Sequence, residues 1–302
     1  MARVWPGSGH TWAVDVHLVD GTYELFRYHF APNNRDPHRG ATRGVLGSVL
    51  SLLESGATHV GVATDHVIES FRNDLWPGYK TSAGMPPELL GQFQLLEDVL
   101  MAAGVTTWPM VELEADDALG AAAVVAASDA RVGRVLICTP DKDLGQCVGG
   151  KVVQWDRRKD VVYDEAGVRE KFGVDPESIP DYLALVGDSA DGFPGIAGFG
   201  SRSAAALLAK FGHIEKIPAA GEDWGVGIRN PGRLAATLRD NFELAMLFRR
   251  IATIERDADV LASVDDLEWT GPSRELLTLA GEIGGRGLAE RAVRLAERRA
   301  GG

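Results

Sequence analysis

The sequence has little of what several common classes of protein need. Among 302 residues there are only two cysteines, and the seven histidines form no ligand-spaced set. Cys138 lies in an apolar run, which is typical of a small core thiol. Cys147 is too isolated to indicate a disulfide framework or a zinc site. No apolar run approaches the roughly 20 residues that span a bilayer, and the first residues lack a secretory apolar core. We therefore expect a cytoplasmic protein without a membrane partner.

Positive charge is also scarce, since the formal net charge is −12 at pH 7. A protein that binds nucleic acid usually shows a basic face, so this balance argues at first against such a partner. The alternative is that the acidic residues are concentrated where metal ions neutralise them. The positions of the aspartates decide between these two interpretations.

The order of the expected elements favours an α/β fold. Short apolar strands are expected at 14–19, 59–64, 105–108 and 135–139. Helices with a 3.6-residue apolar period are expected at 43–55, 89–103 and 116–127. A closing hairpin is expected at 152–155 and 161–163. Strands that alternate with helices indicate a mostly parallel sheet covered by helices on both faces.

The strand signal stops at about residue 165, and helices follow at 181–186, 201–211, 233–251 and 289–299. The sequence therefore predicts two parts, an α/β body over residues 1–165 and a helical region over residues 166–302 that packs against it. Asp15 and His17 put two polar groups on one face of the first strand, and the sequence offers no functional account of them.

Acidic residues gather where the expected strands end. Ligands of open α/β sheets collect beyond the carboxyl ends of the strands. Three strands end at or just before an aspartate, a fourth acidic group opens the helix at 116, and a fifth follows Gly187. These groups are Asp20, Asp65, Asp141 with Asp143, Glu114 with Asp116 and Asp117, and Asp188 with Asp191.

Convergence of these carboxylates would be costly without cations. Two like charges about 4 Å apart repel by about 4 kcal/mol at an effective dielectric constant of about 20. A single aspartate at a strand end is more often a turn former or a helix cap than a ligand. Five groups at equivalent positions favour divalent cations instead, and oxygen ligands select Mg²⁺ or Mn²⁺. Two such ions about 4 Å apart are a known device for phosphodiester hydrolysis.

A glycine-rich stretch after the last acidic group predicts a helix–hairpin–helix at about 181–212. Gly195, Gly198 and Gly200 let the backbone turn with its N–H groups exposed, and Ser201 and Arg202 open the next helix. Such a motif grips a DNA backbone without reading bases. A dinucleotide-binding loop is excluded because no strand precedes the glycines.

With these residues in place, the sequence resembles the 5′-nuclease family, which includes flap endonucleases and the N-terminal nuclease domain of bacterial DNA polymerase I. The resemblance runs from about Val14 to Asp259. Its motifs occur in the family's order: Leu18-Val19-Asp20-Gly21, Asp65, Ser70-Phe71-Arg72, Gly78-Tyr79-Lys80, Glu114-Ala115-Asp116-Asp117, Thr139-Pro140-Asp141-Lys142-Asp143-Leu144, and Gly187-Asp188 through to Gly200.

The resemblance implies roles for individual residues. Asp20, Asp65, Glu114 and Asp116 match a first metal cluster with Asp117 beside it, and a second cluster matches Asp141, Asp143, Asp188 and Asp191. Lys80 matches an active-site lysine that contacts the scissile phosphate. Arg72 and Arg27 match basic positions near the 5′ end of the substrate. A potassium ion held by backbone carbonyls is implied for residues 195–200, and an arch over the single strand for residues 72–88.

Some positions depart from the family's pattern. Ala190 and Gly192 stand where serine and asparagine are common, and Ala197 replaces a hairpin lysine. The stretch after Lys80 lacks a further basic residue, which leaves open the balance of exonuclease and flap-endonuclease activity. We expect a monomeric, metal-dependent nuclease that cuts DNA at 5′ flaps, nicks or overhangs. A ribonuclease of the same α/β type and a non-catalytic branched-DNA binding module are the alternatives.

Overall fold

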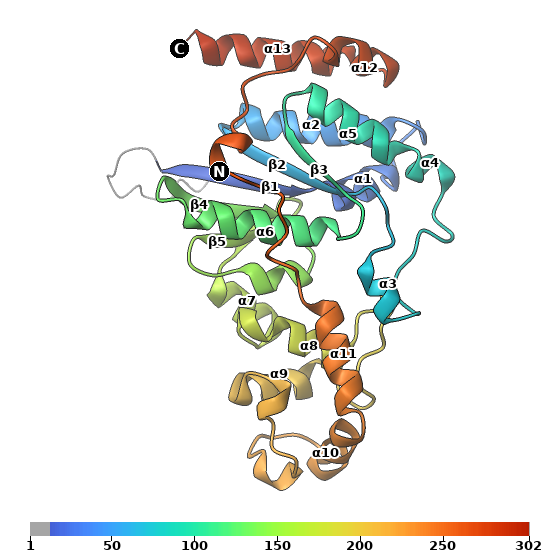
Figure 1. The fold of residues 1–302 in the computed structure, drawn as a ribbon, viewed down its shortest axis with the longest axis vertical. Helices are drawn as coiled ribbons and strands as arrows, with labels where there is room; N and C mark the ends of the chain where they lie inside the picture. The colour runs from blue at the N-terminus through green and yellow to red at the C-terminus, as the bar shows by residue number, and fades with distance from the viewer. Residues whose placement is uncertain (1–12, 302) are drawn as a thin grey trace.

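The computed structural model of the protein describes residues 13–301. A six-stranded sheet lies at its centre in the order β3-β2-β1-β4-β5-β6 (Figure 1). The strands are β1 (Val14–Asp20), β2 (His59–Asp65), β3 (Thr106–Met110), β4 (Val132–Cys138), β5 (Val152–Asp156) and β6 (Val161–Tyr163). Neighbouring strands are parallel except for the antiparallel pair β5 and β6. The predicted α/β fold and its closing hairpin are confirmed.

The strand order reverses beside β1. The chain builds outward from β1 to β2 and β3, and then returns to place β4 on the other side of β1. Connections leave the sheet in opposite directions at such a point and open a crevice at the carboxyl ends of the strands, where ligands gather. Asp20 ends β1 and Asp141 follows β4, so both lie at this crevice.

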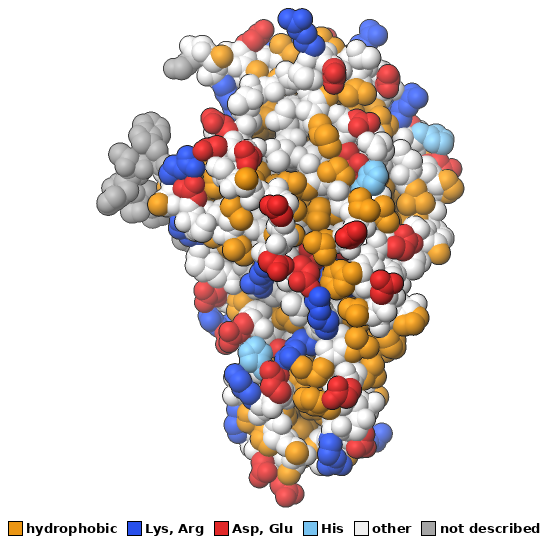
Figure 2. Space-filling view, viewed as in Figure 1, with side chains coloured by type: hydrophobic (Ala, Val, Ile, Leu, Met, Phe, Trp, Pro, Cys, Tyr) orange, Lys and Arg blue, Asp and Glu red, His pale blue; other side chains and the backbone are white. Residues whose placement is uncertain are grey.

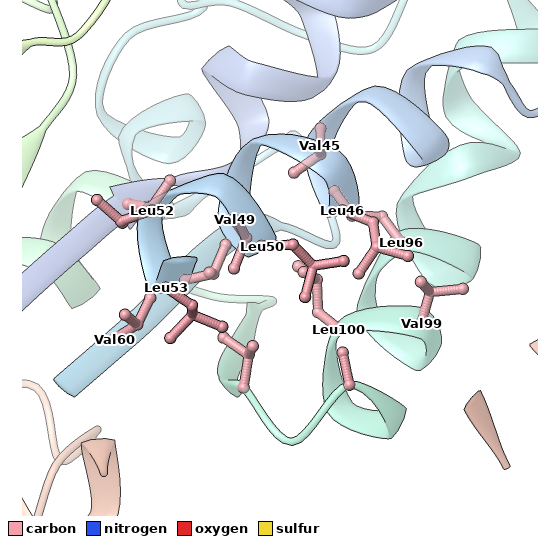
Figure 3. Packing of buried hydrophobic residues seen from close by; sticks show 14 of the residues in the cluster. Val45, Leu46, Val49, Leu50, Leu52, Leu53, Val60, Leu96, Val99 and Leu100 are labelled. Carbon is pink, nitrogen blue, oxygen red and sulfur yellow. The ribbon is translucent and has the colours of Figure 1, made fainter. Parts of the chain in front are cut away.

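Helices cover both faces of the sheet. α2 (Gly40–Glu54) and α5 (Gln92–Ala102) lie on one face, and α6 (Ala115–Ser128) lies on the other (Figure 1). Successive strand side chains point to opposite faces, so Val19 joins the cluster of α2 and α5, whereas Leu18 joins that of α6. The leucines and valines of α2 and α5 point toward one another (Figure 3). Burial of each such side chain contributes about 1.5–3 kcal/mol.

The last two helices return to this α/β core. Leu276 of α12 (Leu276–Glu282), Ile283 just after it and Leu295 of α13 (Arg286–Ala300) are buried in the cluster of α2 and α5. Arg299 donates to the carbonyls of Leu53 and Ala57 at 2.6 and 2.7 Å, near the end of α2. From the sequence we expected all residues after 165 to form one helical region. In the structure, residues 276–300 pack against the α/β body instead.

The helical region proper has a core of its own. It contains α7 (Glu165–Phe172), α8 (Ile179–Val186), α9 (Ser201–Phe211), α10 (Pro231–Asp240) and α11 (Phe242–Ala252), which lie below the sheet in Figure 1. Trp224, Phe193 and Phe248 are among its fully buried side chains. None of the described helices is long and apolar enough to cross a membrane.

Several predicted boundaries were wrong for local reasons. The first strand runs directly into α1 (Gly21–His29), a helix that the sequence did not predict, and Asp20 caps it by accepting from the Tyr23 N–H at 2.8 Å. Gly21 packs against β2, where a Cβ would lie 2.7 Å from the Ala63 carbonyl oxygen. The helix expected at 89–103 is α4 (Pro87–Leu90) followed by α5, and the one expected at 233–251 breaks at Asn241. The sequence also missed α7 and α12.

Asp15 and His17 lie at the start of β1, away from its acidic end. Asp15 pairs with Arg134 at 2.5 Å. His17 is buried, and burial lowers its pKa to about 4 despite the Asp15 carboxylate. Both residues therefore have structural roles, an ion pair across two strands and a neutral core side chain.

Candidate metal centre

The first group of carboxylates forms where β1, β2 and α6 meet. Asp20 and Asp65 end adjacent strands, and Asp65 Oδ1 accepts from the Ala115 N–H at 2.6 Å, which places the start of α6 beside it. Burial, with the charges of Asp65 and Asp141, raises the pKa of Asp20 to about 7, although hydrogen bonds from Tyr23 and Thr139 act in the opposite direction. Asp20 and Asp65 thus lie at the same end of the sheet, and Asp141 lies near enough to affect the pKa of Asp20.

Asp116, in the first turn of α6, lies near the same carboxylates. Burial raises its pKa well above the ordinary value, and Asp141, Asp20 and Asp65 add repulsion that Lys80 only partly opposes. A carboxyl group held in this way takes up a proton in the absence of other cations. The site therefore binds positive charge in one form or another.

A second group gathers Asp143, Asp188 and Asp191. One carboxylate oxygen from each lies within 4.8 Å of the other two. Asp143 opens the short 3-10 helix η1 (Asp143–Cys147), and its buried Oδ1 has no hydrogen-bond partner. Burial and the charge of Asp141 raise the pKa of Asp143, and burial raises that of Asp191 to about 6. Lys142 pairs with Asp188 at 2.5 Å from the outer side.

Lys80 lies between the two groups. Its Nζ is 2.8 Å from Glu114 Oε2 and 3.3 Å from Asp191 Oδ1. Glu114 also accepts from the Ser70 hydroxyl at 2.6 Å and from the Tyr79 hydroxyl at 3.1 Å. Burial alone would raise the pKa of Glu114, but Lys80 and Arg72 lower it. Glu114 is therefore an ionised member of the first group, and hydrogen bonds hold its carboxylate in place.

The structure corrects the roles expected of Arg72 and Asp117. Arg72 is 2% exposed, and its guanidinium donates to both oxygens of Asp117 at 2.8 Å. It also donates to the carbonyls of Ile251 and Thr253 at 2.8 and 3.0 Å. Asp117 is fully buried and accepts from the Glu114 and Glu255 N–H groups as well. Neither side chain is free to contact a substrate or a metal ion, because both are already saturated.

Arg27 lies outside the carboxylate groups. It pairs with Glu24 at 2.5 Å, and its guanidinium lies 4.1 Å from the centroid of the Tyr28 ring. It lines a surface hollow with Tyr23, Phe30 and Arg158. Since Tyr23 bonds to Asp20 through its backbone, this hollow begins beside the first group of carboxylates.

The glycine hairpin connects α8 to α9 as the sequence predicted. Gly195 has a φ of +72° and is buried, and a Cβ there would lie 2.3 Å from the Gly187 nitrogen. Its role is thus to close the hairpin tightly. Gly198, Gly200, Ser201 and Arg202 are exposed and line a hollow together with Arg229, a basic residue that the sequence gave no reason to select.

The surface charge fits the low pI. Acidic and basic side chains are interspersed over the face in Figure 2, and no large basic patch dominates it. The buried carboxylates of the centre account for part of the acidic excess. The negative net charge is therefore compatible with a nucleic-acid partner.

Comparison with known proteins identifies the family of this chain. Residues 15–173 match the family described as 5′-3′ exonuclease, N-terminal resolvase-like domain, and residues 174–275 match 5′-3′ exonuclease, C-terminal SAM fold. The chain belongs to the 5′-3′ exonuclease family. The chain is 31% identical over 272 residues to a 5′-3′ exonuclease of Buchnera aphidicola subsp. Baizongia pistaciae, covering 86% of this chain and 87% of that protein.

Two further relatives extend the family likeness. The chain is 33% identical to DNA polymerase I of Bacillus caldotenax over 91% of its own length but 32% of the polymerase, so it spans about a third of that relative. Among solved structures, T5 5′-exonuclease with bound divalent zinc ions has a TM-score of 0.64 at 18% identity, covering 94% of this chain and 98% of that one. The latter comparison supports the fold.

The family motifs do not single out every residue that builds this centre. Ser70, Tyr79 and Thr139 lie in the quoted motifs, and their hydroxyls orient Glu114 or Asp20. Gln146 was missed altogether. Its amide joins the Asp143 carbonyl to a distant segment at 2.9 Å, and no pattern in the sequence could reveal such a contact.

Proposed function

We propose that this chain is a structure-specific 5′ nuclease that hydrolyses DNA phosphodiesters at 5′ flaps, nicks or overhangs with divalent metal ions. Family membership supports a nuclease. The observation that carries the metal dependence is the crowd of buried, undercompensated carboxylates at the point where the strand order reverses.

The residues present fit hard divalent cations. All the carboxylate ligands offer oxygen atoms, and one oxygen each from Asp143, Asp188 and Asp191 lies within 4.8 Å of the other two. Asp143 Oδ1 accepts no hydrogen bond from the described residues and is free to coordinate an ion. Asp20, Asp65, Glu114 and Asp116 would hold one ion, and Asp141, Asp143, Asp188 and Asp191 would hold another. Mg²⁺ or Mn²⁺ there would supply an activated water and stabilise charge on the phosphate.

Lys80 binds the scissile phosphate in this proposal. Although burial opposes it, the neighbouring Glu114 and Asp191 raise the pKa of Lys80 well above its ordinary value, so the ammonium stays charged. Its side chain is 26% exposed and can therefore reach a substrate. Asn73 donates to the Lys80 carbonyl at 3.0 Å and holds the backbone in place.

The hairpin would bind the duplex away from the cut. The exposed backbone of Gly198 and Gly200, with Ser201 and Arg202, suits a phosphate at the start of α9. We also propose that carbonyls of residues 195–200 hold a potassium ion. Arg229 adds a second guanidinium to this surface.

The domain division and the arch belong to the proposal as well. We propose a nuclease core over residues 1–165, joined by α12 and α13, and a DNA-binding unit over the helical part that begins at 166. The arch at about 72–88 is short, because the chain forms only the short helix α4 between α3 (Phe71–Leu75) and α5. Ser82 is also bound to Glu69 at 2.7 Å. Such an arch favours short 5′ ends over long threaded flaps.

Cleavage of a 5′-labelled flap duplex tests the function. We expect cutting near the junction with Mg²⁺ or Mn²⁺, none with a chelator, and loss of cutting in Asp116→Asn and Asp141→Asn. A flap of the same sequence in RNA serves as a comparison, and preferential cutting of it would favour the ribonuclease. Tight binding without cutting under any metal would favour the branched-DNA binding module.

A further inference from the structure

The segment after α11 joins the two cores of the molecule. Ile251 and Ala252 are buried in the core of the helical region, whereas Ile254 is buried in the cluster under α6. The backbone becomes extended at Thr253, with φ −84° and ψ 126°. We call residues 251–255 the strap. Its backbone is bound to Arg72 and Asp117 on one side and to Gln146 on the other.

Gln146 holds one side of the strap. Its Nε2 donates to the Ala252 carbonyl and to the Asp143 carbonyl, both at 2.9 Å, and its Oε1 accepts from the Ile254 N–H at 3.0 Å. The side chain is 4% exposed. A single amide therefore ties the backbone of Asp143, in the second group, to two positions of the strap.

The Arg72–Asp117 pair holds the other side. Arg72 donates to the carbonyls of Ile251 and Thr253, and Asp117 accepts from the Glu255 N–H at 2.9 Å. Asp117 also accepts from the Glu114 N–H at 2.9 Å. The odd-numbered strap residues are thus bound toward the first group, and the even-numbered ones toward the second.

The contact between the strap and α6 is close. A Cβ at Gly120 of α6 would lie 2.5 Å from Cγ2 of Ile254, so only glycine lets the strap approach this far. Buried backbone groups that lose their partners cost about 1–3 kcal/mol each, so the strap cannot shift without breaking several bonds at once. Its position is therefore well determined, and so are the two loops attached to it.

We propose that the strap sets the spacing between Glu114 and Asp143, and that Gln146 and Arg72 are positioning residues of the metal centre. The inference rests on the proposed function, because it concerns the same centre. It also gives the helical region a direct mechanical link to that centre, since α11 runs straight into the strap.

The test is a titration of the DNA-free protein with Mn²⁺. The electron paramagnetic resonance signal of free Mn²⁺ measures how much of the ion is bound at each step. Gln146→Met keeps the approximate volume and removes all three bonds. We expect the Mn²⁺ concentration at half-saturation to rise about tenfold or more, as it does when groups that orient metal ligands are removed. Glu114 and Asp143 themselves are left intact.

Gln92→Met is the matched control. Gln92 is fully buried, accepts from the Thr42 N–H at 3.1 Å and donates to the Pro37 and Glu88 carbonyls, so none of these bonds involves a residue of the metal centre. It should lower the thermal midpoint as Gln146→Met does, with unchanged Mn²⁺ binding. If both variants bind Mn²⁺ like the wild type, Gln146 is merely structural and the proposal is wrong.

Arg72→Lys provides a second variant if Gln146→Met does not fold. Lysine keeps the charge beside Asp117 but cannot donate hydrogen bonds to both Asp117 oxygens and to two strap carbonyls at once. A rise in half-saturation supports the strap, and an unchanged value in a folded protein contradicts it. If the wild type binds no Mn²⁺ while it still cuts flaps, only this inference falls. If it neither binds nor cuts, the proposed function falls with it.

Discussion

The two groups of carboxylates, here called the rim carboxylates, and the Arg72–Asp117 pair, here called the clamp, both contain buried aspartates. They differ in whether a cationic side chain neutralises the aspartate. Asp116 and Asp117 are neighbours on α6. Asp116 lies among other carboxylates that raise its pKa. Asp117 meets both arms of Arg72 and two backbone N–H groups. The Arg72 guanidinium neutralises Asp117, whereas Asp116 has no such partner among the described residues and is the place where a bound ion would supply the missing positive charge.

Removal of a rim carboxylate should have the largest effect on activity. Asp141→Asn or Asp143→Asn is expected to reduce flap cleavage by more than about 100-fold, the upper range for losing a group that only orients a ligand. The thermal midpoint should stay or rise, because repulsion is relieved. Single-turnover cleavage and thermal unfolding measure both, with the exposed Asp240→Asn as control.

Removal of a clamp carboxylate should instead reduce stability. Asp117→Asn leaves Arg72 buried without its partner, which costs about 3–5 kcal/mol in comparable pairs. Denaturant unfolding of the metal-free protein measures the change. The comparison between rim and clamp breaks down if Asp116→Asn proves as destabilising as Asp117→Asn.

The pH dependence of stability sharpens the same contrast. Asp20 has a pKa of about 7 in the folded metal-free protein against an ordinary value of 3.8, so the folded state holds a proton that the unfolded chain releases. Its contribution to stability is therefore greatest below pH 3.8 and is lost as the pH rises to about 7. Thermal midpoints of the wild type should fall more steeply across this window than those of Asp20→Asn. Equal slopes would mean that Asp20 titrates normally.

The smallest expected effect concerns the hairpin, which lies outside the two groups of carboxylates. Ala197 is exposed on the hairpin, so Ala197→Lys adds a cation without disturbing the fold. The salt dependence of duplex binding should steepen by roughly one phosphate contact. Binding titrations at several salt concentrations measure this, and Ala197→Glu should act in the opposite direction. If both substitutions leave the salt dependence unchanged, the hairpin lies away from the duplex.

Much of the fold could be predicted, because the spacing of apolar residues indicates where the strands and helices lie. The strand ends marked by Asp20, Asp65 and Asp141 followed from the sheet topology, and the structure brings them together at one crevice. The different environments of Asp116 and Asp117 could not be predicted, because the partner Arg72 is 45 residues away and the strap lies further still. The packing of α12 and α13 on the α/β core likewise depends on contacts between segments far apart in sequence.

Thermal unfolding with and without Mn²⁺ tests the central claim most directly, because the rim carboxylates need no substrate to bind ions. At a pH above 7, the account predicts that Mn²⁺ raises the midpoint of the wild type and of Asp117→Asn, since ions that bind only the folded state stabilise it. In Asp116→Asn and Asp143→Asn the rise should be much smaller. A wild-type midpoint that Mn²⁺ leaves unchanged would contradict the assignment of the rim as a metal centre.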